Sequence, residues 1–412
     1  MSRRITSVAL AAMMLLGGVA SAQTKKSAAK SESADSPGEP RKAYTFSSKY
    51  YKITTDVDKE LSKEIAAHMD AVFKEYNRRF ADYGPPLKQQ LPLYVYTTQE
   101  GYMKMLASKG VDGTGSGGMF FGGSSLAAFI GNQGLERMFH TLRHEGFHQF
   151  AHFRIGHELP TWCNEGLAEY FGEAIMIKGA LHTGQVPVEK LAYVQGAVKA
   201  NGHIPFNTLI NMSHSEWNSH LKDGSAQLQY EQSWAMVQHL VEGDKRYKDA
   251  FASYLFGISK GQDSASAFAK AFGSTDYKPF EEAWKKYILA LQPNPEKTAA
   301  KRLQFLASGM EWLKAKGESA ASLDELKEKL QSRKFGMRYS VGHGQVMTMT
   351  STDEENFKAP ESATKKPTTL DWEPPAGDKL PGLVVKGLKY TVRLTWTKDP
   401  LGTDLIPRVA YE

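Results

Sequence analysis

The segment 144–148 reads His-Glu-Gly-Phe-His and contains the residue types of a metal-dependent hydrolase. In a helix, His144 and His148 lie one turn apart and direct their imidazoles to the same side. Zinc accepts imidazole nitrogen and carboxylate oxygen in a tetrahedral shell, and a catalytic site leaves the fourth position to water. Glu165 follows as a candidate third ligand, and Glu145 as a candidate base. These residues predict metal-assisted hydrolysis.

The first segment must be helical for this chemistry, and its sequence favours a helix. Residues 135–155 contain no proline. Apolar residues recur near helical spacing, at Leu135, Met138, Phe139, Leu142, Phe147 and Phe150. Gly156 stands where a glycine would end such a helix. His140 and His152 extend the histidine stripe, but no glutamate follows either one, so we expect them to pack beside the ligands.

A second helix should carry the third ligand. Pro160 and Thr161 form a start signal, and residues 162–174 lack proline. Glu165, Glu169 and Glu173 lie one turn apart on this helix. We expect Glu165 to bind zinc, Glu169 to accept the second ring N–H of a ligating histidine, and Glu173 to lie on a solvated acidic face.

The two segments together resemble the gluzincin metallopeptidases, in particular the peptidase MA-like group of bacterial proteins. The resemblance rests on His144-Glu145-x-x-His148 and on Leu159-Pro160-x-Trp162-x-x-Glu165-Gly166-x-Ala168-Glu169-Tyr170. It implies two histidine ligands, a glutamate ligand, a glutamate base and a carboxylate one turn beyond the third ligand. The specific match covers about residues 115–175, and a weaker likeness extends over 44–292. A metzincin would instead need Gly at 151 and His at 154, where this chain has Ala151 and Arg154.

The resemblance also carries expectations about substrate. Gluzincins commonly bind extended substrate at the sheet edge that precedes the metal helix, so segments 117–121 and 126–130 are candidates, with a plain glycine-rich hairpin as the alternative. Aminopeptidases of this clan carry a Gly-x-Met-Glu-Asn element. Here Gly117-Gly118-Met119 is followed by Phe120-Phe121 and no acid, which favours an endopeptidase.

Gluzincins also bring a tyrosine or histidine from a later helix to the oxyanion. Tyr230, in the helix expected over 228–242, is the candidate, and packing between helices is its alternative role.

The first 22 residues predict an exported protein. Arg3 and Arg4 precede an apolar core over 8–19 and a small-residue cleavage site at 20–22, which is the pattern of a signal peptide. Residues 23–43 are expected to form a flexible tether, and the mature chain to be periplasmic or extracellular, with a retained anchor as the lesser alternative. Cys163 is the single cysteine, so no disulfide within the chain is expected, and we expect it to be buried.

The net charge of +6 indicates little about partners, because residues 1–43 hold seven basic and three acidic groups. We expect a peptide or protein substrate, no nucleic acid, and no stable membrane insertion after leader removal. The sequence does not indicate an oligomeric state.

The remaining patterns predict an α+β fold. Strands are expected over 50–55 and 91–97, and helices over 57–80 and 99–108. Helices over 247–256, 264–272 and 280–291 would complete a helical lower lobe, whereas 181–223 is polar and interrupted by glycine and proline, with surface histidines His203, His214 and His220. The predicted organisation is a zincin-like two-lobed domain over 44–292, a helical connector over 293–332 and a small β-rich segment over 333–412.

The resulting hypothesis is an exported peptidase with one zinc ion, held by His144, His148 and Glu165, and with Glu145 as general base. Two alternatives remain: a non-catalytic zincin-fold binding or envelope protein, and a zinc hydrolase of another amide or an ester. The intact Glu145 argues against the first alternative, because metal binding alone does not require a base.

Overall fold

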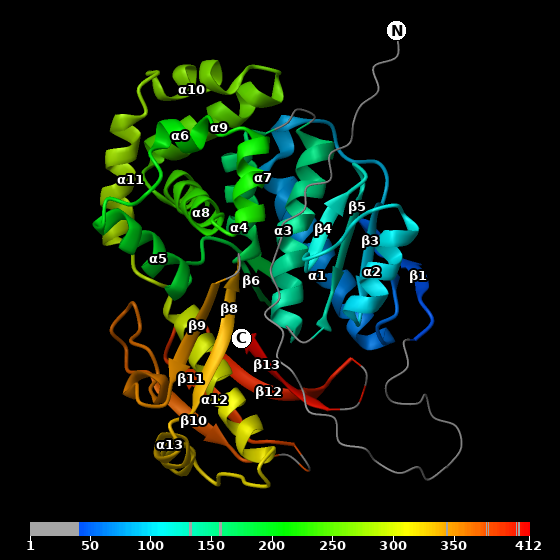
Figure 1. The fold of residues 1–412 in the computed structure, drawn as a ribbon, viewed down its shortest axis with the longest axis vertical. Helices are drawn as coiled ribbons and strands as arrows, with labels where there is room; N and C mark the ends of the chain where they lie inside the picture. Colours follow the sequence, from blue (N-terminus) through cyan, green and yellow to red (C-terminus); the bar gives the residue numbers. More distant parts are fainter. Residues whose placement is uncertain are drawn as a thin grey trace.

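The computed structural model describes residues 41–131, 134–155, 159–342, 345–375, 377, 379–400, 402 and 404–412. Figure 1 shows a mixed α and β architecture, with the segments up to about residue 290 above and the C-terminal strands below. The predicted α+β class is confirmed. The predicted signal peptide and most of the predicted tether lie outside the described residues. Among the described residues, no helix has the length and apolar character needed to cross a membrane.

The first sheet has five strands in the order β1-β2-β3-β5-β4. They are β1 (Tyr44–Ser47), β2 (Tyr51–Thr55), β3 (Leu91–Tyr96), β4 (Gly118–Phe121) and β5 (Ser125–Phe129). β2, β3 and β5 are parallel neighbours, whereas β1 and β4 pair antiparallel at the two edges. Because β4 is at the edge and β5 is paired on both sides, only the first of the two edge candidates lies at an edge. The expectation for 126–130 was wrong.

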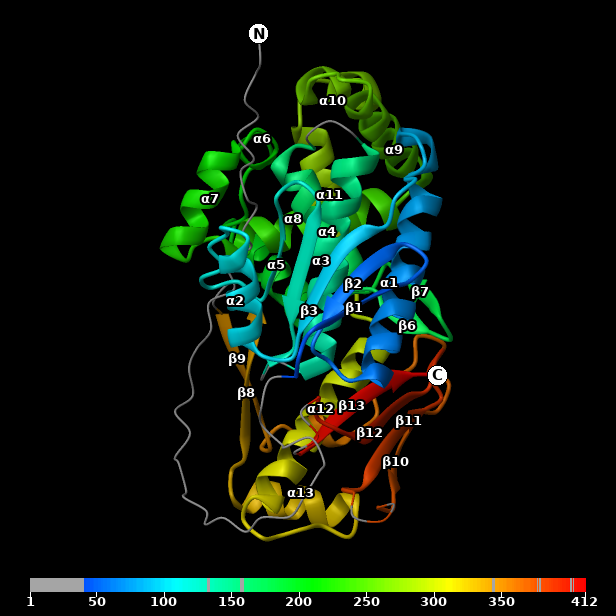
Figure 2. The same ribbon diagram turned by 90° about the vertical axis from the view of Figure 1, so that its right-hand side faces the viewer.

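Three helices cover the two faces of this sheet: α1 (Lys59–Arg79), α2 (Gln99–Ser108) and α3 (Gly134–Arg154). Asp58 starts α1 by accepting hydrogen bonds from two backbone N–H groups, and Thr98 starts α2 by accepting one. Figure 2 shows the strands lying between α2 and α1. Alternate residues of β5 belong to different cores: Leu126 packs with α1 and α3, and Phe129 packs with α2.

Helix α3 packs against β5 and against the edge strand β4 of the first sheet. A Cβ atom at Gly118 would lie 2.4 Å from Thr141 Cγ2 and 2.9 Å from the Ala127 carbonyl oxygen. Glycine therefore allows β4 to approach α3 at the turn that precedes His144. The expected end of this helix at Gly156 falls within 156–158, outside the described residues.

A second lobe is helical. It contains α4 (Thr161–Gly172), α5 (Val188–Lys199), α6 (Phe206–Ile210), α7 (His214–Asp223), α8 (Gln227–Glu242), α9 (Lys245–Ser259), α10 (Ser264–Phe272) and α11 (Lys278–Ala290). The predicted helices at α8 to α11 are confirmed. The irregular region expected over 181–223 instead contains α5, α6 and α7. Pro187 and Pro205 precede helices there, and Ser213 begins α7 with a capping box, so these residues start helices rather than interrupt them.

The C-terminal part combines two helices and six strands. They are α12 (Pro295–Lys314), α13 (Leu323–Ser332), β8 (Gly336–Gly342), β9 (Gln345–Thr350), β10 (Thr369–Glu373), β11 (Gly382–Lys386), β12 (Val392–Lys398) and β13 (Leu405–Tyr411). Helix α12 shares one hydrophobic core with β11, β12 and β13, so the expected connector packs against the strands that follow it.

One sheet joins the C-terminal part to the rest of the chain. Its order is β10-β11-β12-β13-β6-β7, where β6 (Ile175–Ile177) and β7 (Ala180–His182) form a hairpin directly after α4. β13 lies parallel to β6, with Tyr411 opposite Ile177. β13 therefore lies beside the hairpin that directly follows the helix carrying Glu165.

Candidate metal centre

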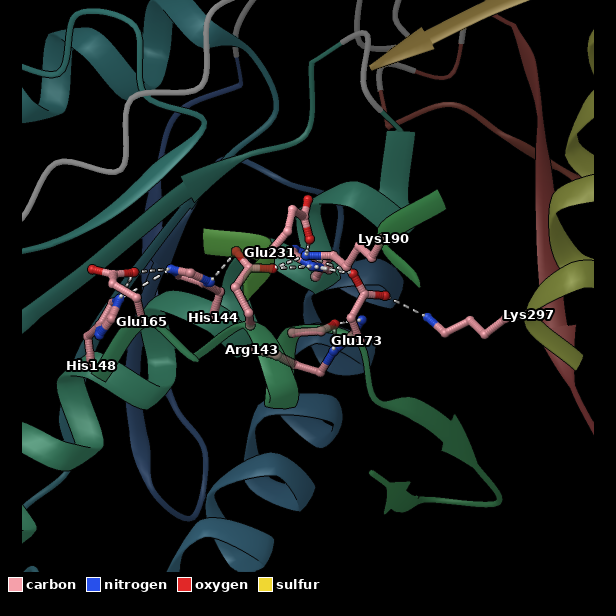
Figure 3. Close-up of polar contacts among 11 residues, drawn as sticks. Arg143, His144, His148, Glu165, Glu173, Lys190, Glu231 and Lys297 are labelled. Carbon is pink, nitrogen blue, oxygen red and sulfur yellow. Dashed lines mark hydrogen bonds and ion pairs between the residues drawn. The ribbon is translucent and has the colours of Figure 1, made fainter. Parts of the chain in front are cut away.

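Three buried side chains from α3 and α4 meet at one point (Figure 3). His144 Nε2 and His148 Nε2 are 3.2 Å apart, and Glu165 Oε2 lies 3.4 Å from each of them. All three residues are at most 3% exposed. The two histidines lie one turn apart on α3, and Glu165 comes from the first turns of α4, as their spacing predicts.

The triangle has the dimensions of one face of a tetrahedral metal shell. An ion with ligand bonds of about 2.0–2.1 Å holds its ligand atoms about 3.3–3.4 Å apart. Glu165 Oε2 is buried and has no well-aligned hydrogen-bond partner among the described residues. A buried carboxylate oxygen without such a partner is unfavourable, and a cation would relieve it. The donor set therefore fits a divalent ion.

The other ring nitrogen of each histidine has its own neighbour. His148 Nδ1 lies 3.1 Å from Asn164 Oδ1, and His144 Nδ1 lies 3.1 Å from Glu169 Oε1. The second contact is an ion pair whose alignment falls short of a good hydrogen bond. With the proton on Nδ1, both imidazoles present the Nε2 lone pair to the site. As expected, Glu169 lies beside one of the two histidines, His144.

Glu145 is held beside the ligands by the sheet edge. Its Oε2 accepts a hydrogen bond of 2.9 Å from the backbone N–H of Phe120 on β4, and the residue is 1% exposed. Burial is the main cause that raises the pKa of its carboxyl, while His144 and His148 oppose the shift. Since Phe120 directs its N–H to Glu145, its backbone groups point away from β5.

The ligand atoms also perturb one another. Burial raises the pKa of Glu165, but His148 and His144 outweigh it and lower that pKa to about 2. Burial lowers the pKa of His144, but Glu165 and Glu169 raise it to about 10. Glu165 and His144 therefore each favour the charged form of the other.

Tyr230 lies on α8, close enough to the same centre for the charge of Glu165 to affect its pKa. It is 1% exposed, and its ring packs edge-on against Trp217 with a centroid distance of 5.0 Å. Burial raises its pKa well above the ordinary value, and the negative charge of Glu165 adds to the shift. The phenol therefore remains protonated and can act as a donor.

Behind the ligands lies a network of buried charges that includes Lys190, Glu231 and Glu173 (Figure 3). Lys190 of α5 pairs with Glu169 Oε2, lies 3.1 Å from Glu231 Oε2 and lies 3.6 Å from Glu173 Oε1. Lys297 of α12 lies 3.1 Å from Glu173 Oε2. The expected solvated position of Glu173 was wrong: it is 7% exposed and is paired with lysines of two other helices.

The outer members of the histidine stripe have different surroundings. His140 is buried, and its Nε2 lies 3.3 Å from Glu173 Oε1, so it packs behind the ligands. The expectation that His152 packs beside the ligands was wrong, because His152 is exposed and its ring lies 5.5 Å from that of Phe120. Cys163 is buried as expected. Among the expected surface histidines, His203 is half-buried and lies 2.9 Å from Glu281.

Several neighbours of the ligands were not identified from the sequence. Asn164 directly precedes Glu165, and this polar residue next to a predicted ligand could have indicated a partner for a histidine. Lys190 and Glu231 lie 25 and 66 residues after Glu165, inside helices with no pattern that points to the site. The Phe120 N–H is a backbone group, so only the position of the edge strand could have indicated it.

A family model described as a protein of unknown function, DUF1570, matches residues 138–262. The matched segment begins on α3 and ends after α9, so it contains both histidines, Glu165 and the buried network up to Glu231. A search of curated proteins finds no match to the chain.

Proposed function

We propose that this chain is an exported zinc metallopeptidase of the gluzincin type, and that it cleaves internal peptide bonds. The observation that carries the proposal is the buried triangle of His144 Nε2, His148 Nε2 and Glu165 Oε2, with edges of 3.2–3.4 Å. Two imidazoles and a carboxylate are a zinc donor set that leaves one position open.

Zinc at this position would supply Lewis acidity to a water molecule and to the scissile carbonyl. The residues of the chain would provide the remaining functions. Glu145, fixed by the Phe120 N–H, would take a proton at its carboxylate and return it to the leaving amine nitrogen. Glu169 and Asn164 would keep the Nδ1 protons of the two histidines in place.

The edge strand offers a place for an extended substrate. β4 pairs with β5 on one side only, among the described residues. The Phe120 carbonyl points away from β5, while the N–H of the same residue is bonded to Glu145. A peptide backbone can bind to such an edge by hydrogen bonds, which do not depend on side-chain identity. The absence of an acidic residue after Met119 supports cleavage within a chain over removal of its first residue.

Tyr230 would stabilise the oxyanion. Its phenol is buried, protonated and close to the carboxylates of the site. A donor in a place shielded from water stabilises developing negative charge more strongly than the same donor in water.

The test uses the mature chain, residues 23–412, and its Glu145→Gln variant. We expect about one zinc ion per chain in both proteins, and hydrolysis of a mixed peptide library only by the parent. Loss of the base should lower the rate by at least about 100-fold, while metal content stays unchanged. Glu282→Gln, an exposed glutamate of α11, is the matched control and should leave both quantities as in the parent.

Each other outcome points to a different conclusion. A zinc-bound parent that cleaves no peptide but hydrolyses other amides or esters would indicate a zinc hydrolase that is not a peptidase. Zinc without any hydrolysis would favour a binding protein, and a parent without stoichiometric metal would overturn the proposal.

A further inference from the structure

A second set of three metal-ligand types lies behind the proposed zinc site. His140, Glu169 and Glu173 are buried, and their ligand atoms lie within 4.8 Å of one another. Such a cluster of acids does not establish a second metal site. The question is which cation balances its carboxylates.

The side chain of Lys190 enters this cluster from α5 (Figure 3). Its ammonium contacts Glu169 Oε2 and Glu173 Oε1, the same oxygens that face His140 Nε2. Its third carboxylate neighbour comes from α8: Glu231 Oε2 lies 3.1 Å from the Lys190 ammonium. The lysine side chain is 9% exposed, and those of Glu169 and Glu231 are at most 2% exposed. The ammonium of Lys190 therefore contacts the carboxylate oxygens that a second metal ion would have to bind.

Glu169 divides its two oxygens between this lysine and the zinc site. Oε2 pairs with Lys190, and Oε1 lies 3.1 Å from His144 Nδ1. A buried carboxylate that loses its cation either takes up a proton or turns toward another donor. In either case it would orient the histidine less well, and partners of metal-bound histidines contribute strongly to metal affinity.

Other charges surround the cluster. Arg137 of α3 is half-buried, and the negative charges of Glu169, Glu173 and Glu231 raise its pKa against the lowering by desolvation. Lys297 pairs with Glu173 Oε2, whereas Lys190 faces Glu173 Oε1. Burial alone would lower the pKa of Lys190, but the three carboxylates together raise it above the ordinary value, so the ammonium keeps its charge.

We propose that Lys190 is a positioning residue of the metal centre, which holds Glu169 so that its second oxygen faces His144. The inference deepens the proposed function and rests on the ligation of a metal by His144, His148 and Glu165. It assigns the lysine a role in metal affinity, in addition to any contribution to the packing of α4, α5 and α8.

The test measures zinc affinity of the mature chain by competition with a chromophoric chelator, after circular dichroism has shown that each variant is folded. We expect Lys190→Met to weaken zinc binding by about 10–100-fold. Lys190→Arg keeps the charge and should recover most of the affinity. Lys297→Met removes another lysine from Glu173 and is the matched control, with an expected change of less than about 2-fold.

A double-variant cycle separates positioning from general destabilisation. If Lys190 acts through Glu169, then Lys190→Met should weaken zinc binding no further in a chain that already carries Glu169→Gln. This arm also serves if Lys190→Met alone does not fold, because the double variant removes both members of the closest pair. Unchanged affinity in folded Lys190→Met, or independent losses in the double variant, would overturn the inference. A parent that binds no zinc would overturn the proposed function instead.

Discussion

At the scale of single residues, the histidines of this protein differ in how their ring nitrogens are used. His144 and His148 each have a polar neighbour at Nδ1, which leaves Nε2 for the triangle. His239, on α8, is 3% exposed, and neither of its nitrogens has a hydrogen-bond partner among the described residues. The rings of Tyr247, Phe280 and Tyr287 lie 4.4–5.9 Å from it. A buried imidazole of this kind is most stable when it is neutral.

This environment predicts an acid-sensitive term in stability. Burial lowers the pKa of His239 to about 4, with Asp244 opposing the shift and Arg246 adding to it. Between about pH 6.5 and pH 4, the unfolded chain therefore binds a proton that the folded chain does not. The free energy of unfolding should fall over this range by on the order of 2–3 kcal/mol from this group, and level off below it. Urea unfolding at pH 7 and pH 4.5 measures the effect.

His239→Leu provides the comparison for that measurement. The variant cannot take up the proton, so its stability should decline less between the two pH values than that of the parent. Equal losses in the two proteins would show that His239 does not contribute.

At the scale of elements, the position of Glu165 depends on how closely α4 approaches α8. A Cβ atom at Gly166 would lie 2.5 Å from the Ser233 carbonyl oxygen and 2.8 Å from Val237 Cγ2. Gly166 therefore faces α8 and not the helix that carries the two histidines. The glycine that faces the metal helix is Gly172, whose Cβ would lie 3.0 Å from His140 Nε2.

Two glycines inside helices therefore predict opposite outcomes on replacement by alanine. Gly166→Ala forces α4 and α8 apart and should destabilise the protein by about 1–3 kcal/mol. Gly196→Ala, in α5, meets nothing within 4 Å and should stabilise it by about 0.5–1 kcal/mol, because alanine favours the helix. Chemical denaturation of the two variants tests the pair. Similar effects from both changes would contradict the close contact between α4 and α8.

At the scale of the whole molecule, the C-terminal part is attached to the elements that carry the ligands. β13 extends the sheet that contains β6, and Arg408 of β13 pairs with Glu64 of α1. Lys297 reaches Glu173, which follows the last residue of α4, and Asn294 Oδ1 accepts a hydrogen bond from the Val186 N–H. These contacts come from different segments, so unfolding of one part should disturb the other.

Leu394→Ala tests this coupling. Leu394 is fully buried in the C-terminal core, and its truncation should cost about 2–4 kcal/mol. If the chain unfolds as one unit, zinc release and the loss of helical signal should move together to lower urea concentration. Zinc release at the same urea concentration as in the parent, after a separate early transition, would show that the two parts unfold independently.

The sequence by itself determined the features that depend on local patterns. The one-turn spacing of His144 and His148 and the apolar periodicity around them specify a helix that presents two imidazoles together. The proline-started segment at 160–172 specifies a second helix with Glu165 near its start. A short strand was missed where the local signal is weak, as in β6.

The tertiary structure decided which of these side chains are buried and which charges they meet. Glu165, Glu169 and Glu173 are equally spaced, but Glu165 faces the histidines, Glu169 joins His144 to Lys190, and Glu173 meets Lys297. These differences come from α5 and α12, which approach α4 only when the chain is folded. Spacing along one helix fixes direction alone, whereas the partner at the end of each side chain is set by packing between segments distant in the sequence.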